Sequence, residues 1–465
     1  MLPFKDLTTA SFASNQKLMH RRHSFLLFTI TAAFIFNLLL LRVSAQDSTI
    51  HLSMSEAIQA TLNNNKSIQL AKMDEGIAAS QYKQTEAIFL PQVGFSYSAL
   101  STNNPLYAFG FKLQEKSITA NDFNPALLNN PSATPDFATK LDVQQPLLNM
   151  DLLYKRKAAE KQTELYQFKT QRTREYLSFE VKKAYLQLLL AYDAVRVLEE
   201  ALKNAQTVYS FTENHFKQGL VQKSDLLNAQ VQKTTIENSL VKAKSNIRNV
   251  SDYLSLLMGQ KNGIIYLADS LVPTKSAATS QSIQVAATRS DFLVMQRAIE
   301  SADLMIKANK MSYLPKLNAF GSYQFNDSHM LGFGAGAYLA GVQLSWNIFK
   351  GNTTKNIIAT QMLERNKLST ELSLQKDQSQ LELDKAFRDL ADGQFGIKQQ
   401  ELAVGQASES LLILQNRYQQ GLVNTTDVLM ASTQLSQQKF ALAQAVFNTH
   451  VTEAYLELLT ASINK

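Results

Sequence analysis

Apolar residues recur at alternating intervals of three and four along two stretches, residues 151–210 and 351–416. Both stretches are nearly free of proline and rich in Ala, Leu, Gln, Glu and Lys, which predicts long helices with a coiled-coil-like seam. At 1.5 Å per residue, each helix would be about 90 Å long. Shorter helices are predicted at four further ranges: 53–88, 224–260, 282–312 and 426–461. Two of these shorter helices placed end to end would be about as long as one long helix.

Four other segments alternate apolar and polar residues, which predicts strands with one apolar face. Pro91 and Pro315 end the helices before the first and third of these segments. Each segment is about as long as a tilted strand that crosses a bilayer. The predicted strands are about 89–101, 136–148, 314–326 and 337–349, and their polar faces carry Lys140, Asp142 and Lys316.

Two pairs of similar segments indicate an internal duplication. The stretch "HFKQGLVQKSDLL" at 215–227 matches "RYQQGLVNTTDVL" at 417–429, an offset of 202 residues. The stretch "AIFLPQVGFSYS" at 87–98 matches "MSYLPKLNAFGSYQF" at 311–325, an offset of 224. The difference between the two offsets places an insertion of 22 residues in the first copy.

The two copies divide the chain into repeats with the same order of elements: short helix, strand, strand, long helix, short helix. We expect the first repeat at residues 46–260 and the second at 282–465. Residues 261–281 interrupt the helical pattern, and we expect them to form an irregular belt around the helices. The first helix of the first repeat should begin with a capping box from Ser53 to Glu56.

Each "GLV" stretch predicts the tip of a helical hairpin. Gly219 and Gly421 would end the long helices in the left-handed conformation, and Ser224 and Thr426 would cap the helices that follow. The acidic residues at the positive first turns of these following helices are Asp225 and Asp427.

The insertion in the first copy falls between two predicted strands, at about 102–135, and contains four prolines. A disordered loop is one interpretation of this composition. Its apolar residues favour partial order, with a strand that continues beyond the membrane; they are Leu106, Tyr107, Phe109 and Phe111.

The first 45 residues are interpreted as a cleaved signal peptide. Arg21 and Arg22 form a basic start, an apolar stretch follows, and Val43-Ser44-Ala45 fits a small-residue cleavage site. A retained membrane anchor is the alternative. Removal of this segment, which contains five Lys/Arg and one Asp, lowers the net charge of the chain from +7 to +3. The small remaining positive charge does not indicate binding to nucleic acid.

The candidate chemistry is sparse. There are no cysteines, which excludes disulfides, thiolate metal sites and a cysteine nucleophile, and the six histidines show no paired spacing. The glycine-rich run 332–336 lies between two predicted strands and opens no helix, so we interpret it as a hairpin loop instead of a phosphate loop. We expect no enzymatic activity, no cofactor and no metal site.

No apolar run of about 18 residues follows Gln46, so a membrane crossing would have to use strands. Four strands cannot close a membrane barrel, because the smallest barrels have about eight and open edges are not tolerated in lipid. Three copies of the chain would supply a 12-strand barrel.

The signal peptide, the duplicated helix–strand–strand–helix–helix order, the proline-started strands and the paired "GLV…D" tips together resemble the TolC-like outer membrane efflux proteins. The resemblance covers residues 46–465. It implies a mixed α+β membrane protein: a homotrimer with a 12-strand barrel in the outer membrane and a helical barrel through the periplasm. It further implies an exit duct that works with a periplasmic adaptor and an inner-membrane transporter of RND, ABC or MFS type.

The resemblance also assigns roles at the tips. Asp427 matches an acidic ring that narrows the duct entrance, and a second acidic position is Met430 here. Tyr418 matches an aromatic position whose hydroxyl helps to lock the tip, with Ser224 and Asp225 as the matching partner pair. Thr426 belongs to the same entrance group. The tip residues that could also dock an adaptor are Gly219, Leu220, Val221, Gly421, Leu422 and Val423, where Val423 replaces an arginine seen in some members.

Two other classes of protein remain as alternatives. A structural, tethering periplasmic coiled-coil protein would explain the helices and leave the four strands unexplained. A hydrolase or sugar-binding protein would need a compact α/β pattern with acidic or histidine clusters in its loops. The lone tryptophan, Trp346, fits a membrane-interface position and equally an ordinary apolar strand position.

Overall fold

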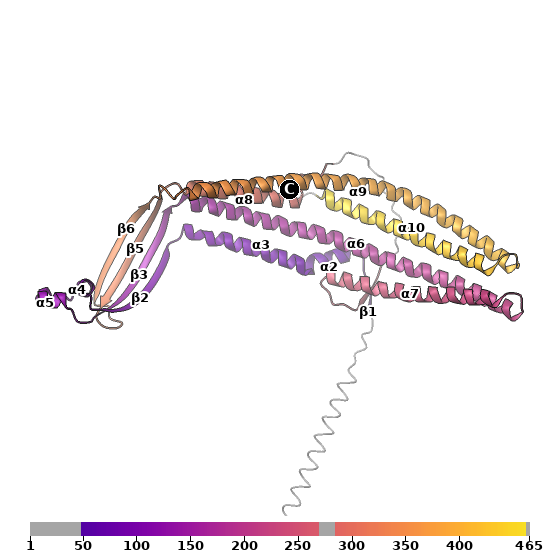
Figure 1. Cartoon of the computed structure of the whole chain (residues 1–465), viewed down its shortest axis with the longest axis horizontal. Coiled ribbons are helices and arrows are strands. Elements are labelled where there is room, and N and C mark those ends of the chain that lie inside the picture. Colours follow the sequence, from indigo (N-terminus) through magenta and orange to yellow (C-terminus); the bar gives the residue numbers. More distant parts are fainter. Residues whose placement is uncertain (1–47, 269–283, 462–465) are drawn as a thin grey trace, which may run out of the picture.

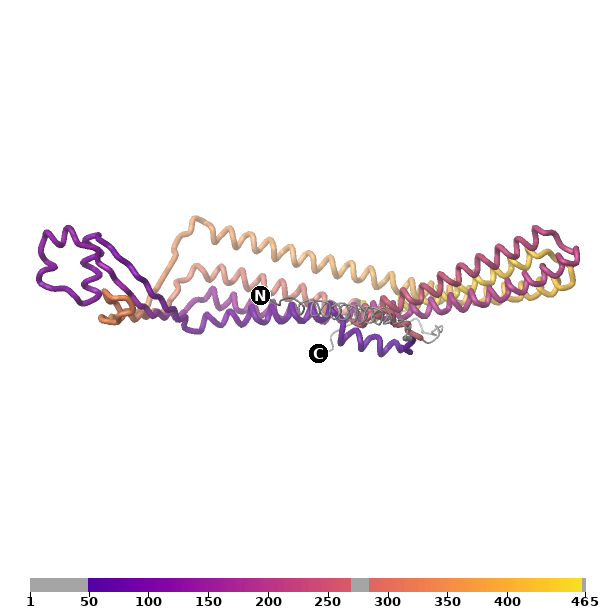
Figure 2. Tube along the Cα trace, turned by 90° about the horizontal axis from the view of Figure 1, so that it is seen from below, coloured from indigo at the N-terminus to yellow at the C-terminus, as the bar shows by residue number. Residues whose placement is uncertain are grey.

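The computed structural model describes residues 48–268 and 284–461, so the predicted signal peptide lies outside the described residues. The molecule is elongated, with a small sheet at one end, two helical hairpin tips at the other, and long helices side by side between them (Figure 1). The helices form a wall whose two sides are lined by α3 and α9 in the half next to the sheet (Figure 2). The bounds of these two helices are Lys66–Gln84 and Thr353–Gln419.

The duplicated helical pattern is confirmed. Each repeat contains one long helix, α6 in the first and α9 in the second, and shorter helices follow one another along it (Figure 1). α3 and then α7 lie along α6, whereas α8 and then α10 lie along α9. The bounds are α6 Met150–Lys217, α7 Lys223–Leu257, α8 Ser290–Met311 and α10 Thr425–Thr460.

The predicted helix at 53–88 is divided in two at Asn65, into α2 (Met54–Asn64) and α3, with a short 3-10 turn at Thr85–Ile88. Asn65 has extended backbone angles, its side chain accepts a hydrogen bond from the Ser67 amide, and its Nδ2 donates to the Leu257 carbonyl at 2.7 Å. The sequence pattern missed this break because one asparagine interrupts the apolar periodicity very little. The capping box from Ser53 to Glu56 is confirmed.

Four antiparallel strands form one sheet in the order β2-β3-β5-β6, and each overlaps its predicted range. β6 ends before Trp346, which therefore lies beyond the strand. The β5–β6 connection contains the first three residues of the glycine-rich run, Gly332–Gly334, whereas Ala335 and Gly336 already belong to β6. Asp327 orders the connection by accepting hydrogen bonds from the amides of His329 and Gly334 at 2.9 Å. The bounds are β2 Gln92–Thr102, β3 Thr134–Leu148, β5 Lys316–Asp327 and β6 Ala335–Ser345.

The strand register separates the two faces of the sheet as the alternation predicted. One row across the four strands consists of Phe95, Leu141, Tyr323 and Tyr338. The adjacent row, on the opposite face, consists of Ser96, Lys140, Gln324 and Ala337. One face is therefore apolar and the other polar.

The insertion between β2 and β3 is helical, so the prediction of an extended strand there is wrong, although partial order is confirmed. α4 (Pro105–Gln114) and α5 (Pro125–Asn129) each begin with proline after an asparagine that caps the helix. Asn104 Oδ1 accepts hydrogen bonds from the amides of Leu106 and Tyr107, which favours a helix where the apolar residues alone suggested a strand.

The segment between the repeats is not wholly irregular. β4 (Ile264–Leu267) pairs in parallel with β1 (Ser48–His51), while residues 269–281 of the predicted belt lie outside the described residues. The small sheet packs against α7 through β4, and α6 is joined to the same region by two hydrogen bonds: Tyr185 donates to the Leu52 carbonyl and Tyr192 to the Tyr266 carbonyl. The largest buried apolar cluster lies here, between α6, α7, α2 and β4.

Replacing Gly259 with alanine should destabilise the chain more than replacing Gly263. Both have positive φ, of +67° and +94°, so each alanine should cost about 1–2 kcal/mol for the left-handed conformation. A Cβ at Gly259 would lie only 2.6 Å from the Asn64 carbonyl oxygen, whereas a Cβ at Gly263 would meet open space. Thermal unfolding in detergent should show a clearly larger fall in Tm for Gly259→Ala. Equal falls would contradict this explanation.

Candidate channel wall and hairpin tips

Both long helices end in the same left-handed cap, as predicted. Gly219 and Gly421 have φ of +76° and +75°. The Leu220 amide donates to the His215 carbonyl at 2.9 Å, and the Leu422 amide donates to the Arg417 carbonyl at 3.0 Å. This six-to-one hydrogen bond is that of a Schellman motif, which ends each helix sharply and starts the turn of the hairpin.

The helices after the turns begin earlier than predicted, so Ser224 and Thr426 are not the N-caps. Gln222 and Asn424 occupy those positions, and Asp225 and Asp427 complete a capping box three residues later. In each box the backbone amide of the cap residue donates to the aspartate Oδ2 at 3.2 Å. The prediction failed because serine and threonine are preferred caps, whereas here the aspartate sets the start.

Tyr418 joins three helices at the tip. Its buried hydroxyl lies 2.7 Å from Thr212 Oγ1 on α6 and 2.7 Å from Thr425 Oγ1 at the start of α10. Among the described residues, these two hydroxyls are its hydrogen-bonding partners, and Ser224 and Asp225 are not. Sequence reasoning missed Thr212, because position 414, its equivalent in the second repeat, is an apolar leucine.

The remaining tip residues divide by exposure. Leu220 and Leu422 project into solvent, whereas Val423 packs against the buried cluster that contains Tyr418. Asp427 is exposed, and Met430, one turn further along α10, is also exposed. The tips therefore present two leucines, a carboxylate and a thioether to their surroundings.

The apolar face of the sheet carries large exposed side chains on all four strands. A second group lies where the strands meet the helices, and there Trp346 Nε1 donates to the Tyr313 carbonyl at 2.9 Å. Exposed apolar side chains on this scale indicate contact with another apolar phase. The members on the sheet face and at the junction are Val93, Phe95, Leu141, Tyr323, Tyr338, Val342 and Leu344, with Phe89, Tyr313, Trp346, Ile348 and Phe349.

Along the described ranges, no helix offers an apolar stretch of 18 residues that would suit a bilayer crossing. Within the same ranges, no three His, Asp or Glu side chains converge in a way that could hold a metal ion.

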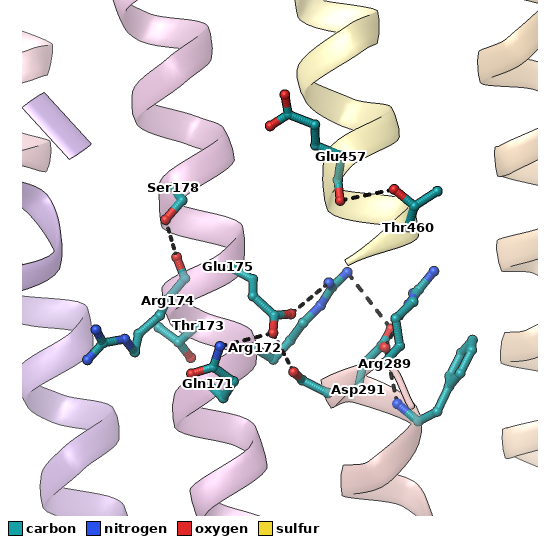
Figure 3. Close-up of polar contacts among 12 residues, drawn as sticks. Gln171, Arg172, Thr173, Arg174, Glu175, Ser178, Arg289, Asp291, Glu457 and Thr460 are labelled. Carbon is teal, nitrogen blue, oxygen red and sulfur yellow. Dashed lines mark hydrogen bonds and ion pairs between the residues drawn. The ribbon is translucent and has the colours of Figure 1, made fainter. Parts of the chain in front are cut away.

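An ionic cluster connects α6 to the start of α8, beside the end of α10 (Figure 3). Asp291 accepts hydrogen bonds from Arg289 and Gln375, and its Oδ2 lies 3.8 Å from Arg172. Arg172 also pairs with Glu175 at 3.4 Å, and Glu175 accepts a hydrogen bond from the Ser290 hydroxyl. No sequence motif identified this cluster, because its members come from three helices.

The wall ends on the same two sides in its sheet part and in its helical part. β2 and β6 are the outer strands of the sheet, α3 and α7 pack against α6, and α9 packs mainly against α8 and α10. Both helical sides expose apolar residues at helical spacing. They are Leu70, Met73, Ile77, Leu227 and Val231 on α3 and α7, and Leu374, Leu381, Phe395 and Leu402 on α9.

The sequence profile of a family described as outer membrane efflux protein matches residues 57–260 and 283–462. The chain belongs to this family. Outer membrane efflux proteins are channels, not enzymes, that work with adaptors and inner-membrane transporters, and the outer membrane is therefore the location of this chain. The match covers both repeats and omits the segment between them.

Individual members of the family are similar over most of the chain. The cation efflux system protein CusC of Escherichia coli O157:H7 is 25% identical over 418 residues, covering 87% of this chain and 78% of CusC. A crystal structure of CusC superimposes with a TM-score of 0.74 at 18% identity, covering 88% of this chain and 92% of that one. The outer membrane protein VceC of Vibrio cholerae gives a TM-score of 0.74 at 17% identity, covering 88% and 97%.

Acid should weaken the cluster around Asp291. Burial acts to raise the pKa of this carboxyl, but the hydrogen bond from Arg289 and the charges of Arg172 and Arg289 outweigh burial and hold the pKa below its ordinary value. A carboxyl with a lowered pKa stabilises the folded state above its unfolded pKa, and this contribution is lost as pH falls through the folded pKa.

The prediction is that Asp291→Asn is less stable than the wild type at neutral pH and that the difference shrinks below about pH 4. Thermal unfolding in detergent across this pH range measures it. Asp303→Asn is the matched control, because Asp303 pairs with Arg365 at 3.1 Å on the surface and should contribute little. A stability difference for Asp291→Asn that does not change with pH would contradict the assignment.

Proposed function

We propose that the chain assembles as a homotrimer and forms an exit duct across the outer membrane and the periplasm. Three sheets close a 12-strand barrel, and the three helical walls continue it as a helical barrel. A periplasmic adaptor and an inner-membrane transporter of RND, ABC or MFS type deliver the cargo and supply the energy. The duct itself is passive.

The two unpaired sides of the wall are the observation that carries this proposal. β2 and β6 leave backbone groups unpaired at both edges of a sheet whose apolar face is exposed, and open edges are not tolerated in lipid. Pairing β2 of one chain with β6 of the next is a head-to-tail contact, which closes into a ring when the rotation allows. The same rotation brings α9 of one chain against α3 and α7 of the next.

Three is the number of chains that suits these strands. Two chains would give the minimum of about eight strands, too narrow for a duct that continues into a ring of long helices, whereas three give 12, well within the observed range of membrane barrels. The apolar face then meets lipid, and Trp346 with its aromatic neighbours lies at the periplasmic interface. Lys140, Asp142 and Lys316 line the lumen.

The tips form the gate in this proposal. Tyr418, Thr212 and Thr425 hold the α9–α10 hairpin against α6, and the duct opens when an adaptor docks on Leu220, Leu422 and neighbouring tip residues and the hairpins untwist. Three copies of Asp427 narrow the closed entrance with negative charge, and Asp225 and Thr426 lie beside it. A tether without channel activity is disfavoured, because it would not need a sheet with one apolar face.

Cations are the first cargo to test, because CusC is named as a cation efflux protein and Asp427 would attract positive charge. Small organic molecules and type I secreted proteins are the other cargoes that the family resemblance allows.

Asp427→Asn should change the ion selectivity of the closed channel. Removing three carboxylates from a narrow entrance should lower the cation preference, because the field in a constriction is set by the charges that line it. Single-channel recording in planar bilayers measures the reversal potential under a salt gradient. Asp225→Asn is the matched control, because both aspartates accept the same capping hydrogen bond, whereas the proposal has Asp427 narrow the entrance and Asp225 lie beside it.

A fall in cation preference confined to Asp427→Asn would support the gate. Unchanged selectivity in both variants would remove Asp427 from the entrance and leave the duct in place. The absence of any channel from a folded oligomer would overturn the duct and favour the tether.

Phe395→Glu should weaken the oligomer. Phe395 is 65% exposed in the single chain, and the proposed ring buries it against α3 and α7 of the next chain. An unpaired buried carboxylate typically costs on the order of 3–5 kcal/mol, so the oligomer should dissociate at a lower temperature. Gel migration after heating in detergent measures this. Ile50→Glu is the control, because Ile50 is 47% exposed on β1, a strand that pairs with β4 of the same chain and has no part in the proposed contact. Equal effects would contradict the head-to-tail contact.

A further inference from the structure

The turn that connects α7 to β4 contains the sequence Asn262-Gly263, and no other asparagine in the chain is followed by glycine. Both residues are exposed and lie outside helices and strands. Asparagine is a thermolabile residue, because the carbonyl carbon of its side chain can be attacked by the backbone nitrogen of the next residue. A glycine in that next position has no side chain to shield the nitrogen and allows wide backbone rotation. The sequence of this turn therefore favours attack on Asn262.

The structure leaves space around the attacking residue. Gly263 has a φ of +94°, and a Cβ at this position would meet no atom within 4 Å. The other glycine of the same turn, Gly259, is closely packed, because a Cβ there would lie 2.6 Å from the Asn64 carbonyl oxygen. The turn is therefore fixed where it leaves α7 and open where Asn262 and Gly263 meet.

One contact opposes the reaction. The Gly263 amide donates a hydrogen bond to Asp252 Oδ1, on α7, at 2.9 Å. The nitrogen must lose this proton before it attacks, and it would then carry a negative charge beside the negative charge of the carboxylate. A carboxylate that accepts an N–H hydrogen bond stabilises the protonated amide, and a nearby like charge disfavours the ionised form. Asp252 should therefore slow the attack on Asn262.

We propose that Asn262 is a site of spontaneous deamidation and that Asp252 restrains its rate. The Gly263 nitrogen gives its proton to hydroxide, forms a bond to Asn262 Cγ and displaces the side-chain nitrogen as ammonia, which leaves a succinimide. The departing nitrogen takes a proton from water and so regenerates hydroxide. Water then opens the succinimide: attack at Cγ gives aspartate, and attack at the backbone carbonyl carbon gives isoaspartate. The net reaction consumes water and releases ammonia, so it needs no oxidant and no cofactor.

Either product would alter the turn that brings β4 back along α7. β4 begins directly after Gly263 and pairs with β1. It is held on α7 by Tyr266, whose amide donates to Ser251 Oγ at 3.3 Å. Aspartate at position 262 adds a carboxylate next to the amide that Asp252 accepts, and the two like charges repel each other. Isoaspartate instead adds a methylene group to the backbone just before the strand. Deamidation should therefore weaken the attachment of β4 to α7.

Ageing of the purified protein tests this proposal. The protein is kept in detergent in a mildly alkaline buffer and digested at intervals, and mass spectrometry follows the replacement of each asparagine amide by an acid. Isoaspartate is assayed with an isoaspartyl methyltransferase. Asn103 is the internal control, because it is also exposed and outside helices and strands but is followed by Asn104. Gly263→Ala is the blocked variant, since its methyl group shields the backbone nitrogen.

In the wild type, Asn262 should convert several-fold faster than Asn103, and Gly263→Ala should remove the difference. Conversion of Asn262 no faster than that of Asn103 would overturn the modification site.

Asp252→Asn removes the charge and keeps a side-chain oxygen, and it should make Asn262 convert several-fold faster than in the wild type. Asp252→Ala is a second variant, for use if the first does not fold. An unchanged or slower conversion in a folded variant would overturn the restraint by Asp252. Aged wild type should also unfold at a lower Tm than fresh protein, whereas aged Gly263→Ala should not change. An unchanged Tm after conversion would overturn the effect on β4.

Discussion

Unsatisfied backbone hydrogen bonds at the edges of a four-stranded sheet are the constraint on which the rest of this structure depends. The sheet exposes an apolar face and ends in two unpaired strands, β2 and β6. An apolar environment provides no water to hydrogen-bond the free N–H and C=O groups of these edge strands. Strands from other chains must therefore pair with them. The helices repeat the same geometry, because α3 and α7 end the wall on the side of β2 and α9 ends it on the side of β6. Membership in the outer membrane efflux protein family gives this arrangement its context.

The duplication explains how one chain builds a wall of such length. Each repeat uses one long helix as a continuous support and places two shorter helices along it, so that the breaks between short helices never coincide with a break in the long one. The tips repeat as well, and both use the same left-handed glycine and the same aspartate capping box. The repeats differ in one large respect: the insertion in the first turns over the polar face, whereas the shorter loop of the second turns toward the apolar face.

Much of the fold could be predicted from the sequence, for reasons that are local. Long helices and alternating strands impose periodic patterns that remain recognisable over many residues even where single positions depart from them. The turns at the tips require positive φ, which predicts glycine at positions 219 and 421. Predictions failed where one side chain decided the outcome. Asn65 breaks a helix, Asn104 and Pro105 turn an apolar stretch into a helix, and the capping aspartates move two helix starts. The contacts of Tyr418 with Thr212 and of Arg172 with Asp291 join distant helices, and no local pattern contains that information. The assignments of gate and docking residues remain predictions.

The two junctions between stacked helices have diverged in chemistry. At the offset of 224 residues, Arg289 is equivalent to Asn65. The first repeat joins its helices through a neutral hydrogen bond from Asn65 to Leu257, which protons and salt leave unchanged. The second has charged groups around Asp291 instead, which join the start of α8 to α6 and α9 and weaken when Asp291 is protonated. The two halves therefore respond unequally to acid at these positions: protonation of Asp291 weakens the contacts that hold the start of α8 against α6 and α9, whereas the hydrogen bond between Asn65 and Leu257 is unaffected, so any mechanical compliance that acid adds here falls at the start of α8.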